Sequence, residues 1–281
     1  MGAVTPLRRE AAAEVEELEL ELLLEALFQR YGYDFRSHER ALLRRKLRGV
    51  MRTRGLRTLS SLQDRALHDP AAASATLRAL HVPPATLFDD TDEARQLRQL
   101  AGGCLRGAAL PRIWLADCAG AEQAWTLAVI LAEEGLLEHT EIHATVASDE
   151  QLEEALDAAI PLDRMAAAQA AYARAGGAGQ LASHFQVDGK RAVLAPALRS
   201  HITWAQYNLV TDASFNEFNL IACRRALPDF GPLLRQRVLH LFHESLAPFG
   251  ILGLDRPLQQ SDPLWGSYAP AAPAPWHRRI A

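Results

Sequence analysis

The sequence predicts an α/β protein in which a small all-helical N-terminal domain precedes a domain with a mostly parallel sheet. Two observations predict this class. Up to about residue 80 the apolar residues have helical spacing, and from Pro111 onward short apolar runs alternate with helical patterns. Strands that alternate with helices are joined by crossovers, so the second pattern indicates a parallel sheet covered by helices on both faces.

The first domain is expected over residues 1–80 and holds four predicted helices. The first helix, Glu10 to Gln29, is rich in Ala, Leu and Glu and contains neither Gly nor Pro. The second, Ser37 to Gly55, combines one apolar stripe with many arginines. Two shorter helices follow, at Ser60–His68 and Pro70–Leu80.

Residues 81–110 are expected to form a linking segment with a helix at Asp92–Ala101, because prolines and paired glycines interrupt the rest. The large domain then covers residues 111–281. Its expected strands are Ile113–Ala116, Glu141–Val146, Val193–Leu194, His201–Trp204, Phe218–Cys223 and Gly250–Asp255, and its expected helices are Glu122–Glu134, Asp149–Ala159 and Pro232–Leu246. The Pro/Ala-rich tail, Pro270 to Ala281, is expected to be peripheral.

Composition excludes several classes of protein. A hydrophobic content of 49% in 281 residues supports a sizeable core, and the net charge of −4 is not typical of nucleic-acid binding. The three cysteines are odd in number and widely spaced, unlike a disulfide framework or a zinc site. No apolar run has transmembrane length, so we expect a cytoplasmic protein without membrane insertion.

The segment Arg112–Glu122 has the pattern of a strand that runs into a helix, where nucleotide-like cofactors bind in α/β proteins. Glycines in such a turn allow backbone N–H groups to approach a ligand closely. Asp117 and Ala121 occupy the positions where this approach matters. The sequence therefore combines an intact scaffold with an altered pocket.

Four motifs carry a resemblance along nearly the whole chain. They are Tyr31-Gly32-Tyr33-Asp34-Phe35 with the arginine-rich segment Leu43–Leu56, then Trp114-Leu115-Ala116-Asp117-Cys118, Tyr207-Asn208-Leu209, and Phe218-Asn219-Leu220-Ile221-Ala222-Cys223-Arg224. In this order they resemble chemotaxis-type protein-glutamate methyltransferases, the CheR family, whose corresponding motifs after the N-terminal domain are W-S-A-G-C-S-T-G-E-E, N-L and F-D-L-I-F-C-R-N. Each motif alone is weak, but the ordered set is specific.

The resemblance implies a small helical domain followed by a Rossmann-like methyltransferase domain. It also implies an ancestral reaction in which S-adenosylmethionine (SAM) methylates glutamates on the coiled coil of a chemoreceptor. Enzymes of this family mainly position the acceptor and the donor, so proximity supplies much of the rate.

The departures from the family fall where SAM should bind. The Asn, Thr and Arg of its N-x-T-x-F-F-R segment, which contact SAM, correspond to Pro83, Ala85 and Asp89. Asp89 would repel the SAM carboxylate that the arginine attracts. The acidic residue that holds the ribose hydroxyls corresponds to Val146, and the Asn after Cys-Arg corresponds to Arg225.

Part of the family's pocket survives. The residues that could still bind a cofactor are Glu122, Asn208, Leu209, Arg224 and Arg225, in a pocket also lined by Asp89, Asp117 and Val146. A hydrogen bond to a charged group contributes about 1.5–3 kcal/mol. About 1.4 kcal/mol is tenfold in affinity, so losing the ribose carboxylate and the arginine costs on the order of a hundredfold or more. No catalytic residue is assigned, and SAM or its demethylated product, S-adenosylhomocysteine, is the cofactor only if this pocket is competent.

The predicted second helix holds seven basic residues within fifteen positions, from Arg40 to Arg54. The resemblance implies that such residues contact an acidic receptor helix, and the candidate partner-binding residues are Arg44, Arg45, Arg48 and Arg52. The alternative is a solvated face. The Glu-rich first helix packs on its own domain or mediates a partner or dimer contact, and the sequence leaves these alternatives open.

Other side chains are weaker candidates. Two histidine pairs have the spacing of one helix face, His240 with His243 and His139 with His143, but no third ligand is evident and no metal site is predicted. A helix start could lower the pKa of Cys118, although a packing role is favoured. Asp149 could replace the lost ribose ligand, although a first-turn acid favoured by the helix dipole is the better interpretation.

The sequence supports three functional hypotheses. The favoured one is a degenerate CheR-like protein that acts as a binding or regulatory module in chemosensory signalling, with a helix of a chemoreceptor or another signalling protein as its partner. The second is an active SAM-dependent protein-glutamate methyltransferase whose rearranged pocket relies on Glu122, Asn208 and Leu209. The third is a sensor that holds another, anionic nucleotide-like ligand at Arg224 and Arg225.

Overall fold

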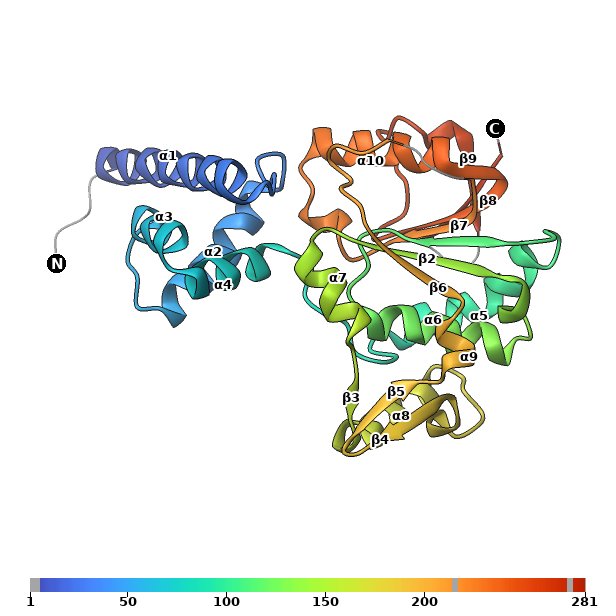
Figure 1. Ribbon diagram of the computed structural model, residues 1–281. Helices are drawn as coiled ribbons and strands as arrows, with labels where there is room; N and C mark the ends of the chain where they lie inside the picture. Colours follow the sequence, from blue (N-terminus) through green and yellow to red (C-terminus); the bar gives the residue numbers. More distant parts are fainter. Residues whose placement is uncertain (1–5, 214–216, 272–274, 281) are drawn as a thin grey trace. The chain divides into compact units, whose positions relative to one another are not determined.

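The computed structural model describes residues 6–213, 217–271 and 275–280 (Figure 1). The chain divides into two compact units. The helical unit contains the chain up to Pro83 together with Asp229–Arg235, and the sheet unit contains Pro84–Pro228 and the chain from Gln236 onward. The predicted class, an all-helical domain followed by a Rossmann-like domain with a mostly parallel sheet, is confirmed.

The helical unit contains the four predicted helices: α1 (Pro6–Tyr31), α2 (Arg40–Thr53), α3 (Leu59–His68) and α4 (Pro70–Leu80). Its core is built on the inner face of α1, where Leu20, Leu23, Leu24 and Leu27 are fully buried. Caps fix the shorter helices, because the side chain of Thr58 accepts from Ser61 N at 3.1 Å and that of Asp69 accepts from Ala71 N at 2.9 Å.

The segment Asp229–Arg235 completes the helical unit from far along the chain. Glu39 N donates to the carbonyl of Asp229 at 2.8 Å, and Gly231 N donates to the carbonyl of Ser37 at 3.0 Å. Gly231 has no room for a side chain, since a Cβ there would lie 2.7 Å from that same carbonyl oxygen. The unit is therefore discontinuous in sequence.

The main sheet of the other unit has seven strands among the described residues, in the order β6-β2-β1-β7-β8-β10-β9. The first five are parallel: β6 (Ile202–Gln206), β2 (Glu141–Val146), β1 (Arg112–Leu115), β7 (Phe218–Cys223) and β8 (Leu246–Leu254). Ile113 of β1 lies opposite Ile142 and Leu220, which fixes the register of the buried central strands.

Helices cover both faces of this sheet (Figure 1). α5 (Thr91–Leu105) and α6 (Ala121–Glu133) pack on one face, and α6 contributes a run of buried aliphatic side chains from Leu127 to Leu131. On the other face Phe242 of α10 (Pro232–Ser245) meets the ring of Trp114 edge-on, with ring centroids 5.4 Å apart. No helix among the described residues is long and apolar enough to span a membrane.

The expectation of a peripheral tail is wrong. β9 (Tyr268–Ala271) and β10 (Trp276–Arg279) are antiparallel strands of the main sheet, with β10 between β8 and β9. Trp276 is fully buried and its Nε1 donates to Gln96 Oε1 at 2.9 Å. Pro270 is compatible with this arrangement because β9 is an edge strand, where a missing N–H donor is tolerated.

An insertion follows α7 (Asp149–Leu156) and precedes β6 (Figure 1). It contains a small antiparallel sheet of order β3-β5-β4 and the two helices α8 and α9. Of these five elements, the sequence predicts only part of β5, as the strand Val193–Leu194. The elements are β3 (Ile160–Pro161), α8 (Met165–Arg174), β4 (Phe185–Asp188), β5 (Arg191–Leu194) and α9 (Pro196–Arg199). Glu133 of α6 anchors it by accepting from Tyr172 Oη and lying 3.2 Å from His184 Nε2, while Arg98 pairs with the same carboxylate at 2.6 Å.

Candidate functional site

The carboxyl ends of β1, β2, β6 and β7 lie at one edge of the main sheet, because these strands are parallel neighbours. In open α/β sheets the ligand site lies outside this edge. The loops after these strands, together with the segment that precedes α5, therefore form the candidate site. Every sequence-predicted cofactor residue lies on one of these loops, at a strand end, at the start of α6, or in the segment before α5.

The turn after β1 keeps a left-handed residue, although Asp117 replaces the glycine of the family's motif. Asp117 has φ 50°, a left-handed conformation that Asp adopts more readily than most residues. Gly120, with φ 87°, precedes the first turn of α6. The chain itself binds the N–H groups of this turn, since Cys118 N donates to the carbonyl of Thr145 and Ala119 N donates to Gln123 Oε1, both at 2.7 Å.

The segment Ala85–Asp90 packs against this turn and the start of α6. Ala85 N donates to the carbonyl of Ala119 at 2.7 Å, and Phe88 N donates to Thr126 Oγ1 at 3.1 Å. Phe88 is buried and also has a positive φ, 55°. A bulky side chain in this conformation is strained and persists only where its surroundings enforce it. The segment is therefore a fixed wall of the site.

Glu122, at the first turn of α6, is held by a bidentate ion pair. Its two carboxylate oxygens each lie 2.9 Å from a terminal nitrogen of Arg164, and Oε2 also accepts from Leu87 N at 2.9 Å. Arg164 belongs to the insertion, 42 residues further along the chain, and sequence reasoning missed it. No motif marks this arginine, because the insertion has no recognised pattern at that point.

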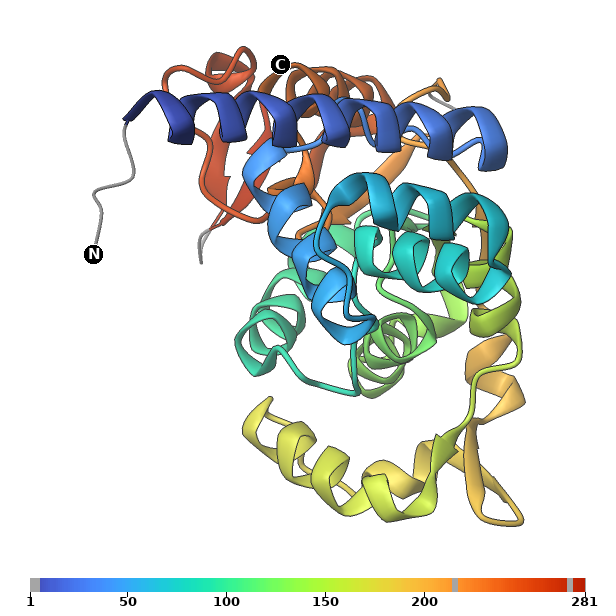
Figure 2. The ribbon, with the colours of Figure 1, turned by 90° about the vertical axis from the view of Figure 1, so that its left-hand side faces the viewer.

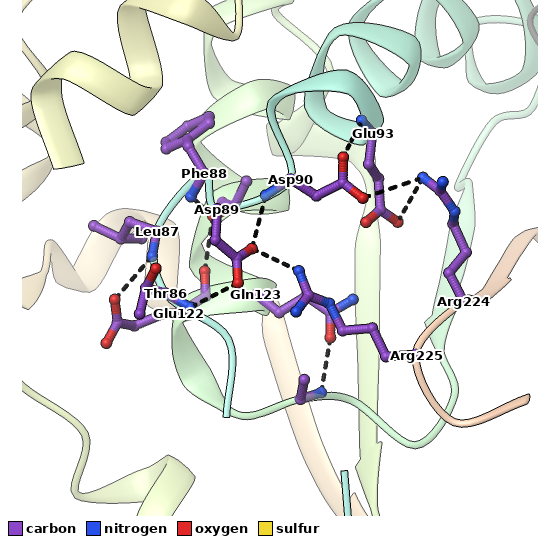
Figure 3. Close-up of polar contacts among 12 residues, drawn as sticks. Thr86, Leu87, Phe88, Asp89, Asp90, Glu93, Glu122, Gln123, Arg224 and Arg225 are labelled. Atoms are coloured by element: carbon purple, nitrogen blue, oxygen red, sulfur yellow. Dashed lines mark hydrogen bonds and ion pairs between the residues drawn. The ribbon is translucent and has the colours of Figure 1, made fainter. Parts of the chain in front are cut away.

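Asp89 and Arg225, two predicted site residues, form a second ion pair (Figure 3). Arg225 Nη2 lies 2.5 Å from Asp89 Oδ1. The same carboxylate accepts from Asp90 N at 2.9 Å and from Thr86 N at 3.1 Å. The Asp89 carboxylate therefore has three donors within the chain, and the guanidinium that replaces the family's asparagine is directed at it.

Arg224 is directed toward α5 and not toward the Asp89–Arg225 pair (Figure 3). Its Nη1 lies 3.6 Å from Glu93 Oε1 and 4.0 Å from Asp90 Oδ2, and its Nε donates to the carbonyl of Leu254 at 3.2 Å. Burial raises the pKa of Glu93, which Arg224 opposes by favouring the charged form. Arg224 thus joins β7 to α5 and β8.

The loop after β6 carries Asn208 and Leu209, and the hydrogen bonds of Asn208 are local. Asn208 Oδ1 accepts from Val210 N and Asn208 N donates to Asp212 Oδ2, both at 2.9 Å, while Leu209 is buried. Val146 is fully buried at the end of β2. Asp149 is exposed in the first turn of α7, where Ser148 caps the helix by accepting from Gln151 N at 3.2 Å.

Two cavities adjoin these pairs. One, of about 270 Å³, lies between Thr86, Glu122 and Arg164 and the helix α8, which contributes Ala168 and Arg174. The other, of about 30 Å³, lies behind the Asp89–Arg225 pair. A volume of this size holds about one water molecule.

The arginines of α2 mostly meet carboxylates of their own unit. Arg44 pairs with Glu17 of α1, and Arg48 Nη2 lies 2.7 Å from Glu16 Oε1. Arg45 and Arg52 are exposed, and no ion pair to them is found within the described part of the chain. The candidate partner-binding set is therefore split between two paired and two exposed residues.

The structure also bears on the weaker candidates. Cys118 is buried, and burial raises the pKa of its thiol, which agrees with the favoured packing role and not with a thiol whose pKa a helix start lowers. Over the residues that the structure describes, no group of three or more His, Cys, Asp or Glu side chains is arranged to hold a metal ion.

Comparisons with known proteins agree with the motifs. Residues 94–256 match the CheR methyltransferase SAM-binding domain, and residues 18–80 match the CheR methyltransferase all-alpha domain. A putative methyltransferase, Cher3, of Pseudomonas putida is 34% identical over 85% of this chain and 87% of its own length.

Two further matches are more distant. An uncharacterized 104.1 kDa protein of Rhodobacter capsulatus is 25% identical over 79% of this chain, which spans only 23% of that protein. The glycopeptide N-methyltransferase MtfA, solved with sinefungin, is 19% identical over 66% of this chain and 60% of its own, with a TM-score of 0.34. The two domain matches and the Pseudomonas relative establish that the chain belongs to the CheR methyltransferase family.

Proposed function

We propose that this chain is a degenerate member of the CheR family that does not bind SAM at useful affinity and acts as a cytoplasmic binding or regulatory module in chemosensory signalling. One observation carries the proposal. The charged groups at the cofactor end of the sheet unit are bound to one another, Glu122 to Arg164 and Asp89 to Arg225.

The residues present do not fit SAM. Its carboxylate would meet Asp89, a carboxylate that already has three donors, in place of the family's arginine. Its ribose hydroxyls would meet Val146, which is fully buried and whose side chain has no polar group. Glu122, the surviving acidic residue, could bind a cofactor only by releasing Arg164 or by sharing its oxygens.

The magnitude of the loss supports the same conclusion. A hydrogen bond to a charged group contributes about 1.5–3 kcal/mol. The Asp89 and Arg225 side chains are 32% and 26% exposed, so solvent screening reduces the strength of their pair. Even at the low end of that range, two missing contacts cost about a hundredfold in affinity, before any like-charge repulsion is counted.

An active methyltransferase with a rearranged pocket is the second candidate. The match to the SAM-binding domain and the cavity of about 270 Å³ beside Glu122 favour it. A sensor for an anionic nucleotide-like ligand has less support, because Arg225 is paired with Asp89 and Arg224 lies against Glu93 and Asp90.

As a binding module, the chain is expected to contact a helix of a chemoreceptor or of another signalling protein. Arg45 and Arg52 support this part of the proposal, because they are exposed on α2 and form no ion pair found within the described residues. Arg44 and Arg48 are engaged with α1 and contribute less.

Calorimetric titration with SAM and with S-adenosylhomocysteine tests the proposal. We expect no binding up to millimolar concentration. Micromolar binding of either compound, or methyl transfer to a glutamate-containing receptor helix, would establish the active-enzyme alternative.

A variant that restores the family's residues is the matched positive control for that titration: Pro83→Asn, Ala85→Thr, Asp89→Arg, Val146→Asp and Arg225→Asn combined. It should bind S-adenosylhomocysteine at least about a hundredfold more tightly than the natural sequence. Arg164→Ala, which frees Glu122 alone, should not restore binding. Equal affinities of the restored and natural sequences would contradict the assignment of these positions as the cause.

A further inference from the structure

The helix α1 has apolar side chains on two opposite faces. On the inner face, Leu20, Leu23, Leu24 and Leu27 are fully buried in the helical unit. On the outer face, Val15, Leu18 and Leu22 are 58%, 56% and 50% exposed. These three follow at spacings of three and four, so they form one line along the helix. Figure 2 shows α1 running along the whole helical unit.

Carboxylates flank this outer line. Glu14, Glu21 and Glu25 repeat at spacings of seven and four along one edge, and Glu19 lies on the other edge. Arg36 lies 2.8 Å from Glu25, but among the described side chains the nearest cation to Glu21 is Arg40, at 4.0 Å. Glu19 accepts from the hydroxyl of Ser60 at 2.6 Å. For Glu14 no ion pair is found within the described residues.

Two other glutamates of α1, which lie nearer its inner face, form ion pairs with arginines of α2. Glu16 and Glu17 face α2 and pair with Arg48, Arg44 and Arg40. The α1–α2 interface therefore engages three of the six basic residues of α2. Of the carboxylates beside the apolar line, Glu21 has only a 4.0 Å contact with a cation, and Glu14 has no ion pair within the described residues. The outer face of α1 is apolar along its centre and acidic at its edges.

We propose that this outer face, Val15 to Leu22, binds an amphipathic helix of a partner protein whose apolar stripe is flanked by Lys and Arg. Val15, Leu18 and Leu22 have the a-d-a spacing of a heptad, which a second helix fills with its own apolar side chains. Lys and Arg on the flanks of the partner helix would pair with the carboxylates of Glu14 and Glu21. Such a partner has the opposite charge from the acidic helix expected at α2, and its binding does not depend on whether SAM binds.

A second copy of this chain fits the face less well. Pairing two outer faces would bring the acidic edges of both copies together, and like charges at such positions are destabilising. The apolar line spans about 10 Å, since each helical residue advances about 1.5 Å. A contact of about two helical turns predicts weak binding. Loss of either the apolar contacts or the ion pairs should therefore reduce the affinity clearly.

Fluorescence anisotropy with two synthetic peptides tests the proposal on the full chain. The probe peptide is a heptad-repeat amphipathic helix with Leu at the a and d positions and Lys at the flanking e and g positions, and the control peptide carries Glu at those flanks. We expect the Lys peptide to bind and the Glu peptide to bind at least about tenfold more weakly. Equal binding of the two peptides would overturn the proposal.

Variants separate the face from the rest of the surface. Leu18→Gln with Leu22→Gln should weaken binding of the Lys peptide at least about tenfold, because two half-exposed leucines lose their apolar contact. The matched control is Leu110→Gln with Leu156→Gln, at side chains that are 51% and 57% exposed elsewhere, and it should bind unchanged. Glu14→Gln with Glu21→Gln should weaken binding several-fold and flatten its dependence on salt.

Two outcomes would contradict the proposal. Unchanged binding of the Lys peptide to the Leu18→Gln, Leu22→Gln variant would show that it binds elsewhere. Sedimentation of the full chain as a dimer that this variant abolishes would identify a second copy, not a basic helix, as the occupant.

Discussion

The helical unit and the cofactor end of the sheet unit both pair their charges within the chain, but with different consequences. In the helical unit, Arg40, Arg44 and Arg48 pair with glutamates of α1 across the surface of two helices. In the sheet unit, Asp89 pairs with Arg225 where relatives of the CheR family place groups that contact SAM. The first set joins two helices, whereas the second joins the segment before α5 to the end of β7, at the candidate site.

The contribution of an ion pair to stability depends on how far its two charges are exposed to solvent. Exposed pairs contribute little to stability, because water solvates the separated charges almost as well. A partly buried pair has a larger effect on stability when it is broken, because removal of one partner leaves the other charge buried and unpaired. At the candidate site we therefore expect the pairs to affect ligand binding more than stability. In the helical unit we expect only the more buried pair, Lys46 with Asp229, to affect stability strongly.

The largest effect is expected for Lys46→Met, which removes the most buried pair of the helical unit. Lys46 Nζ lies 2.5 Å from Asp229 Oδ2 and also donates to the carbonyls of Leu80 and His81, at 2.9 and 3.2 Å. Burial raises the pKa of Asp229, and Lys46 opposes that shift. Losing the amine should cost about 3 kcal/mol.

Hydrogen exchange measured by mass spectrometry on peptides of α2 and α4 gives this cost in the full chain. The control is Lys190→Met, since Lys190 is exposed in the turn between β4 and β5. Equal protection of α2 in the two variants would show that the buried pair is no stronger than a surface pair.

A pH dependence of the helical unit is the next effect. Burial lowers the pKa of His38 from its ordinary 6.5 to about 4, with Lys46 and His81 adding repulsion and Asp34 opposing it. The unfolded chain therefore binds more protons between pH 4 and 6.5, and stability falls as the pH falls through that window. From pH 7 to 5 the loss attributable to His38 is about 2 kcal/mol.

The comparison variant for this prediction is His38→Phe, which keeps a ring between Phe35 and Phe230. Exchange protection of α2 should depend less on pH in the variant than in the natural sequence. The same pH dependence in both would exclude His38 as its source.

A smaller effect is expected at the cofactor end. Asp89→Asn removes the charge opposite Arg225 and weakens the bonds from Thr86 N and Asp90 N, at a cost of about 1 kcal/mol. Urea unfolding followed by tryptophan fluorescence measures it, because all five tryptophans belong to the sheet unit. Asp92→Asn, which breaks the exposed pair with Arg95, is the control and should have no measurable effect. A loss above about 3 kcal/mol for Asp89→Asn would make the pair a structural element.

The smallest effect is expected for Arg48→Gln. Its guanidinium lies 2.7 Å from Glu16 but is 59% exposed, so the loss should stay below about 0.5 kcal/mol. Exchange protection of α1 and α2 should match that of Arg52→Gln, which breaks no ion pair found in the described residues. A clear difference between the two variants would show that the α1–α2 pairs act as a cooperative network.

Much of the fold could be predicted from the sequence, since strong periodicity marked all four helices of the helical unit and the strands β1, β2 and β7. The strands β9 and β10 could not, because the Pro/Ala-rich segment around residues 270–275 has no alternating pattern and its strands are specified by distant partners such as Gln96. The insertion was also missed, because its strands are short and its helix α8 is mostly alanine and polar residues.

The candidate site could be predicted only one residue at a time. Asp89 and Arg225 were each identified as departures from the family, but their pairing joins positions 136 residues apart, which no local pattern encodes. Arg164 had no signal at all. The pairing of α1 with α2 did have one, since a Glu-rich helix followed by an Arg-rich helix indicates complementary faces.

The return of Asp229–Arg235 to the helical unit has a consequence for how this unit can be inherited and produced. During synthesis α2 is made well before the segment that contacts it. About 190 further residues must be added to the chain before Asp229 can pair with Lys46 and Phe230 can contact His38. A gene fragment cut after Pro83 would encode all four helices but not this segment. In recombination between relatives, the N-terminal helices should therefore exchange cleanly only when the strip around Asp229 is exchanged with them.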